Sequence, residues 1–182
     1  PESIPSWIKF TQGYYDIYCD NGDLPTELMD SVITLNPDTK QAEISDKLAS
    51  KNLWIHSVNT LISYYFAFNW LDPVIGGNNA SQRAIRQALA IAMDINEYID
   101  IFRNGNALLA ECILPSGING YQPPPEYINA TAHRWNSSLR RSENRNIAEA
   151  KKLMIQAGYP NGIGPDGKPL TIYMDHAAAG KP

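Results

Sequence analysis

Residues 64–94 constrain the fold most, because the spacing of apolar residues changes within them. Residues 64–68 form a continuous apolar and aromatic run, which is typical of a strand covered on both faces. Asp72-Pro73 and Gly76-Gly77 then mark a turn. After the turn the apolar residues follow a helical period, at Ala84, Ile85, Ala88, Leu89 and Ala92. We therefore predict a buried strand, a turn, and a helix whose alanine-rich face lies against a sheet.

The rest of the chain alternates between helical and extended patterns. Helices are predicted at residues 6–11, 24–35, 39–50, 95–103 and 144–157. Short strands are predicted at residues 16–19, 53–56, 61–68 and 170–174. Residues 110–135 are rich in glycine and proline and have little periodicity, so we predict a long surface loop there.

Charge and hydropathy exclude several classes of partner. Fifteen Lys and Arg against nineteen Asp and Glu give a net charge of −4, which provides no electrostatic reason to expect nucleic acid or an anionic membrane as a partner. No apolar run reaches the roughly eighteen residues of a membrane span. The chain starts without Met and without a signal peptide, and we expect it to be an internal part of a longer protein.

The sequence gives only weak indications of catalytic groups. His56, His133 and His176 lie at no spacing from a carboxylate or cysteine that matches a metal site or catalytic triad, so structural roles are expected for them. Capping and solvent exposure explain the carboxylates between Asp94 and Asp100 better than acid–base catalysis does.

No cofactor or metal motif is found. Gly76-Gly77 follows the predicted strand, but the Gly-Lys-Ser/Thr of a phosphate loop is missing. Cys19 and Cys112 fit either one disulfide or two separate thiols. The basic residues that precede the last predicted helix are expected to be solvated, and they are Arg134, Arg140, Arg141 and Arg145.

Four separated segments carry a resemblance to a known family. They are the aromatic run with its turn and RAIRQALAIAMD (83–94), then YIDIFRNG (98–105), LPSG (114–117) with GY (120–121), and EAKKLMIQAGYP (149–160). In this order they resemble the family 5 extracellular solute-binding proteins, which are the dipeptide, oligopeptide and nickel receptors of ABC importers.

The resemblance implies an α/β fold with a mixed sheet flanked by helices, of the two-lobed periplasmic-binding-protein type. Residues 1–58 would form the end of the first lobe, and residues 59–182 would form most of the second lobe, truncated at its C-terminus. The 182 residues alone would then bind a ligand weakly or not at all.

The resemblance also implies ligand contacts. In the family, side chains from the strand that crosses between the lobes reach the cleft, and these match Tyr64 and Tyr65. Side chains from the loop after a later strand also reach the cleft in the family, and these match Asp175 and His176. A tyrosine ring can stack on a ligand while its hydroxyl forms a hydrogen bond, although core packing is the simpler explanation for aromatic residues on a strand. Ala67 departs from oligopeptide receptors that have an acidic residue at this position.

The expected function is therefore that of the solute-binding component of an ABC importer. We expect a monomer, exported to the periplasm or cell exterior, that traps a di- or oligopeptide by hinge closure and passes it to a membrane permease without catalysis or a cofactor. Two alternatives remain open. One is a hydrolytic enzyme or enzyme accessory domain of the α/β class that uses carboxylates between Asp94 and Asp100 or His176, and the other is a structural or partner-binding module that uses the loop at residues 110–135.

Overall fold

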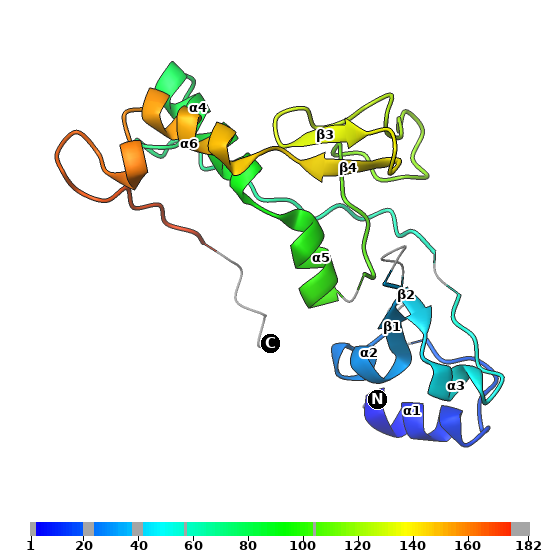
Figure 1. Ribbon diagram of the computed structural model, residues 1–182. Coiled ribbons are helices and arrows are strands. Elements are labelled where there is room, and N and C mark those ends of the chain that lie inside the picture. Colours follow the sequence, from blue (N-terminus) through cyan, green and yellow to red (C-terminus); the bar gives the residue numbers. More distant parts are fainter. Residues whose placement is uncertain (1–2, 20–23, 38–41, 57, 104, 176–182) are drawn as a thin grey trace. The chain divides into compact units, whose positions relative to one another are not determined.

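The computed structural model describes residues 3–19, 24–37, 42–56, 58–103 and 105–175. The chain forms two compact units. The first contains residues 1–58 and 95–109, and the second contains residues 59–94 and 110–182. Figure 1 shows the helices and strands of both. No helix in the described part of the chain has the length and apolar character needed to span a membrane.

The first unit is a small helical assembly with one hairpin. Its strands pair antiparallel, with Ile33 opposite Ile44. Leu28, Val32, Ile33 and Leu48 form its core. In chain order its elements are α1 (Ser3–Thr11), α2 (Thr26–Val32), β1 (Ile33–Leu35), β2 (Ala42–Ile44), α3 (Asp46–Ala49) and α5 (Ile95–Arg103).

The hairpin corrects two predicted helices. The helix predicted at residues 24–35 ends at Val32, and the next three residues form β1. Ile33 and Thr34 are β-branched and favour an extended backbone once a partner strand supplies hydrogen bonds. The helix predicted at residues 39–50 is instead β2 followed by the four-residue α3, and residues 39–41 lie outside the described residues.

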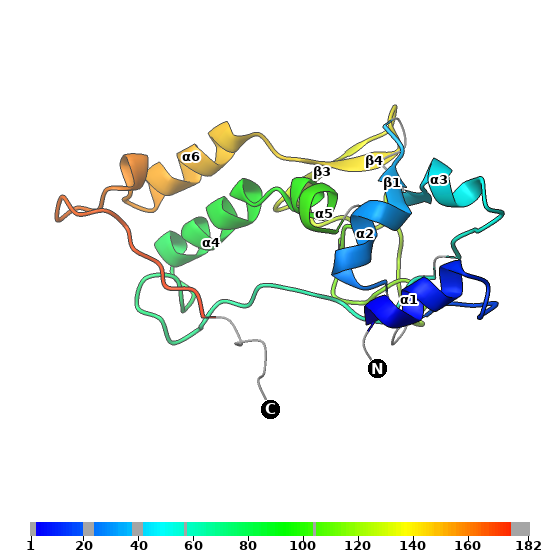
Figure 2. The same ribbon diagram turned by 90° about the horizontal axis from the view of Figure 1, so that it is seen from below.

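The second unit is built on a pair of helices. Its elements are α4 (Ala80–Ala92), β3 (His133–Asn136), β4 (Arg141–Asn144), α6 (Ile147–Gln156) and the short 3-10 helix η1 (Pro160–Gly162). Figure 2 shows α4 and α6 side by side. The fully buried residues between them are small or β-branched, namely Ala84, Ile85, Ala88, Ile91, Ala150 and Ala157, and Leu153 and Met154 of α6 pack against these. The predicted alanine-rich face of α4 is thus correct, but it packs against α6 and not against a sheet.

Helix α4 begins at a reciprocal cap. The Asn79 side chain accepts a hydrogen bond from the Gln82 backbone N–H at 2.8 Å. In return, the Gln82 side chain accepts one from the Asn79 backbone N–H at 3.3 Å. These two bonds satisfy donors that the first turn of a helix leaves unpaired, and they fix where the helix starts.

The predicted strand at residues 61–68 is wrong. In the described part of the chain this segment belongs to no strand, and Tyr64, Tyr65 and Phe66 are exposed. A strand needs a neighbour that pairs its N–H and C=O groups, and no described segment pairs with this one. The strands predicted at residues 16–19, 53–56 and 170–174 are also absent, and of the last only Leu170 is paired with another described residue, through its backbone N–H to the Gly162 carbonyl at 2.7 Å.

The sheets that do form are two separate antiparallel pairs, β1–β2 and β3–β4. The chain therefore combines helices with small antiparallel sheets, in keeping with the α/β class. The predicted helices at residues 95–103 and 144–157 correspond to α5 and α6. The predicted loop is irregular from residue 110 to residue 132, and its last residues enter β3.

Candidate functional site

Two of the residues predicted to contact a ligand lie on an open segment of the second unit. Tyr64 is 83% exposed and Tyr65 is 73% exposed. Asp175 is also exposed, while His176 lies outside the described residues. Among the described residues, the structure contains no hydrogen bond or ring contact between Asp175 and either tyrosine.

Side-chain hydrogen bonds to the long loop hold the chain just before these tyrosines. Asn59 donates from Nδ2 to the Ser116 hydroxyl at 3.1 Å. Ser63 donates from its hydroxyl to the Ile113 carbonyl at 3.1 Å. The position of Tyr64 therefore depends on the position of the loop.

On the other side of the tyrosines, a capped turn leads into α4. Asp72 Oδ1 accepts the backbone N–H groups of Val74 and Ile75, at 2.7 and 3.0 Å. The Arg86 guanidinium on α4 lies 4.7 Å from the centre of the Trp70 ring, a cation–π distance. The aromatic segment is thus fixed at both ends and exposed in between.

The long loop is anchored by a buried carboxylate that sequence reasoning missed. Glu111 and His133 are 6% and 4% exposed. Glu111 Oε2 accepts the Asn129 backbone N–H at 2.8 Å and lies 2.8 Å from His133 Nδ1. The carboxylate has to accept here, so Nδ1 carries the proton. The contact joins the start of the loop to its end and to β3.

The surroundings of Glu111 determine its charge state. Burial raises the pKa of Glu111, but the Ser142 side chain, the Asn129 N–H and His133 together outweigh burial, so the pKa lies below its ordinary value of 4.5. The Ser142 hydroxyl helps to lower the pKa of Glu111, although among the described residues its oxygen has no hydrogen-bond partner of standard geometry. Glu111 is therefore ionised at neutral pH.

This lowered pKa predicts how stability depends on pH. Because the folded-state pKa of Glu111 lies below the unfolded value, its contribution is complete above about pH 4.5 and disappears as the pH falls through the folded pKa. We expect the free energy of unfolding to fall more steeply below pH 4.5 in the wild type than in Glu111→Gln. Urea titrations from pH 3 to pH 7 measure this difference, and parallel curves would contradict the prediction.

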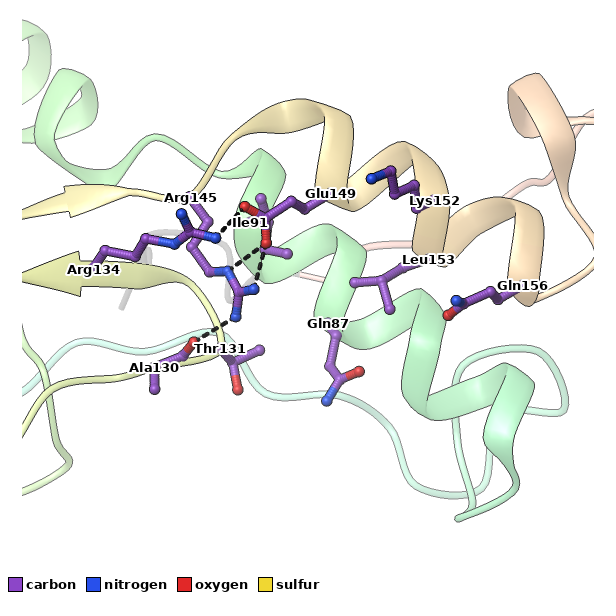
Figure 3. A pocket seen from close by; sticks show the side chains of 10 residues that line it. All are labelled: Gln87, Ile91, Ala130, Thr131, Arg134, Arg145, Glu149, Lys152, Leu153 and Gln156. Carbon is purple, nitrogen blue, oxygen red and sulfur yellow. Dashed lines mark hydrogen bonds and ion pairs between the residues drawn. The ribbon is translucent and has the colours of Figure 1, made fainter.

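A pocket of about 630 Å³ lies between α4, α6 and the end of the long loop. Figure 3 shows Arg134 and Arg145 converging on Glu149 at its edge. Arg134 donates to one Glu149 oxygen at 2.6 Å, and Arg145 binds the other oxygen. Arg145 also donates to the Ala130 carbonyl at 2.9 Å, and Lys152 completes the charged lining. The hydrogen bond from Arg145 is the largest of the effects that lower the Glu149 pKa.

A second pocket of about 340 Å³ adjoins the first, because Gln87 and Thr131 line both. Phe68, Arg83 and Arg86 also line this second pocket. Two of the arginines predicted to be merely solvated, Arg134 and Arg145, therefore help to shape a pocket.

The catalytic alternative gains no support from the described residues. Asp94 follows α4 in the second unit, whereas Glu97 and Asp100 lie on α5, which clusters with the first unit. No group of three or more His, Cys, Asp or Glu residues in the described part of the chain is arranged to hold a metal ion. Cys19 and Cys112 are free thiols.

Comparison with known proteins adds one finding. The family model described as "Bacterial extracellular solute-binding proteins, family 5 Middle" matches residues 27–179, which is most of the chain. Neither the curated proteins nor the solved structures gave a match.

Proposed function

The chain belongs to the family 5 bacterial extracellular solute-binding proteins, and from this premise we propose that it captures a di- or oligopeptide and delivers it to the permease of an ABC importer. Members of this family are exported, non-enzymatic proteins that bind a solute for import. The match over residues 27–179 is the observation that supports the proposal most strongly.

We place the ligand contacts at Tyr64 and Tyr65, together with Asp175 and His176. The exposure of both tyrosines supports this placement, because a side chain that packs in a core is not available to a ligand. An exposed tyrosine offers a flat apolar face and one hydroxyl, which suits a peptide with both apolar and polar groups.

The proposed mechanism is hinge closure between two lobes by a monomeric receptor. Residues 1–58 would belong to one lobe and residues 59–182 to the other. The start of the second compact unit at Asn59 agrees with this division, whereas α5 clusters with the first unit. Ligand contacts made by both lobes would favour the closed state, since a ligand shifts an equilibrium only by its difference in affinity for the two states.

Replacing Tyr64 by alanine tests the ligand site. We expect peptide affinity to fall at least about tenfold, because an aromatic contact and a hydroxyl are lost, with little change in the thermal midpoint because the ring is exposed. Calorimetric titration of the complete two-lobed receptor, with and without the substitution, against defined di- to pentapeptides measures the change. Tyr14→Ala is the matched control, since Tyr14 is 73% exposed but lies in the first unit.

Two results would contradict the proposal. Equal peptide affinity in Tyr64→Ala and Tyr14→Ala would remove Tyr64 from the site. Binding of a sugar or metal chelate by the wild type, without binding of any peptide, would overturn the peptide assignment while leaving the family intact.

A further inference from the structure

The two adjoining pockets of the second unit concentrate positive charge. Five basic side chains line them, namely Arg83, Arg86, Arg134, Arg145 and Lys152, and Glu149 is their one acidic lining residue among those described. We call this surface the basic groove. Its lining carries a formal excess of four positive charges, obtained as five minus one, in a chain whose net charge is −4. Such a local reversal attracts an anionic partner.

Glu149 indicates which anionic group the groove suits. Its carboxylate is held between two guanidinium groups, one from β3 and one from just before α6 (Figure 3). Planar guanidinium groups match carboxylates in a two-pronged geometry, which makes arginine a specific carboxylate receptor.

Some basic side chains of the groove remain available to a partner while Arg134 and Arg145 bind Glu149. Among the described residues, the structure shows no partner for the side chains of Arg83 or Lys152. Arg134 contacts Glu149 through Nη2, and its side chain is 65% exposed. The pocket amides and the Thr131 hydroxyl supply neutral donors between these charges.

We propose that the basic groove is a docking surface for an acidic segment of a partner protein. A segment with several Asp or Glu side chains can place carboxylates in both pockets at once. The way Arg134 and Arg145 bind the two oxygens of Glu149 favours a protein segment over a membrane, because carboxylate side chains spaced along one segment can repeat this contact in both pockets. This inference does not depend on the proposed peptide ligand, which contacts other residues.

The experiment uses hexaglutamate as the probe. We expect it to bind the wild-type protein, and hexaglutamine not to bind, by microscale thermophoresis. Binding should weaken as salt rises from about 0.1 to about 1 M, since the screening length falls from about 10 to about 3 Å. The double variant Arg83→Gln and Lys152→Gln should weaken affinity about fivefold or more, because two charges are lost.

The control removes two charges elsewhere. Arg140→Gln with Lys151→Gln changes the net charge equally, and neither residue lines the groove. Equal weakening in both double variants would reduce the effect to general electrostatics and overturn the proposal. Binding to vesicles of anionic lipid, lost in the groove variant, without hexaglutamate binding would assign the groove to a membrane. Concentration-dependent dimerisation lost in the same variant would assign it to a second copy of the chain.

All four residues changed in these variants are exposed, so folding should be preserved, and circular dichroism checks this. As a second measurement, amide chemical shifts of Gln87 and Thr131, which line both pockets, should move on titration with hexaglutamate. Unchanged shifts at both residues alongside measurable binding would place the site elsewhere and overturn the proposal.

Discussion

Replacing Glu111 by alanine should lower the free energy of unfolding by about 3 kcal/mol and the thermal midpoint by roughly 10 °C. The carboxylate is buried and accepts from Asn129 N–H and His133 Nδ1, both at 2.8 Å. Truncation leaves both donors without an acceptor inside the protein and removes the link between the loop and β3. Urea denaturation and thermal melts followed by circular dichroism measure the two effects.

A second variant separates the buried contact from the mere loss of a charge. Glu126→Ala removes an exposed carboxylate from the same loop, and its free energy of unfolding should change by less than about 0.5 kcal/mol. In a double-mutant cycle with His133→Phe and Glu111→Leu, the cost of both changes together should be smaller than the sum of the single costs. Additive costs would show that the two side chains do not act as a pair.

Replacing Ile85 by alanine should also cost about 3 kcal/mol. Ile85 is 1% exposed and packs between α4 and α6, in the cluster that contains Ala84 and Ala157. The small neighbours already bring the helices close together, so the structure has little freedom to collapse into the cavity that the change creates. Chemical denaturation gives the loss directly, with an unchanged slope if the denatured state is unaffected.

Ile155→Ala is the matched control for Ile85, because it removes the same atoms from a side chain on α6 that is 60% exposed. We expect a change within about 0.5 kcal/mol. Similar losses in the two variants would mean that the α4–α6 interface does not carry the stability of the second unit.

The helices of this chain could be predicted because their signals are local. Apolar residues recur every three or four positions in α4, and the Asn79–Gln82 cap lies at its start, so pattern and boundary agree. Gly13, with φ of +84°, likewise marks the end of α1. What such a helix packs against is not local information, which explains why α6 was not identified as the partner of α4.

The strands were predicted poorly because a strand is completed by a second segment. Residues 61–68 have the composition of a buried strand, but composition does not supply a neighbour. Conversely, β4 (Arg141–Asn144) is polar throughout, and its sequence contains no strand signal. It forms because β3 pairs with it, His133 opposite Asn144.

The candidate site was predicted only in part for a related reason. Tyr64 and Tyr65 were selected because a tyrosine side chain can both stack on a ligand and form a hydrogen bond. Their role remains a prediction. Glu111 and His133 are separated by 22 positions across a segment without periodicity, so no spacing rule brings them together. The basic groove was missed because its charges come from α4, β3 and α6, and each is unremarkable in its own stretch of sequence.

The two hydrogen bonds from Asn59 and Ser63 to the long loop have a consequence for how such a receptor can diversify. The loop binds Asn59 and Ser63, which precede Tyr64 in the chain. Substitutions among residues 113–117 can therefore shift the aromatic segment without changing any of its own side chains. Under the proposed placement of the ligand at Tyr64, such exchanges would change recognition from positions outside the ligand site. The hydrogen bonds of Glu111 to Asn129 and His133 meanwhile hold the two ends of the loop together.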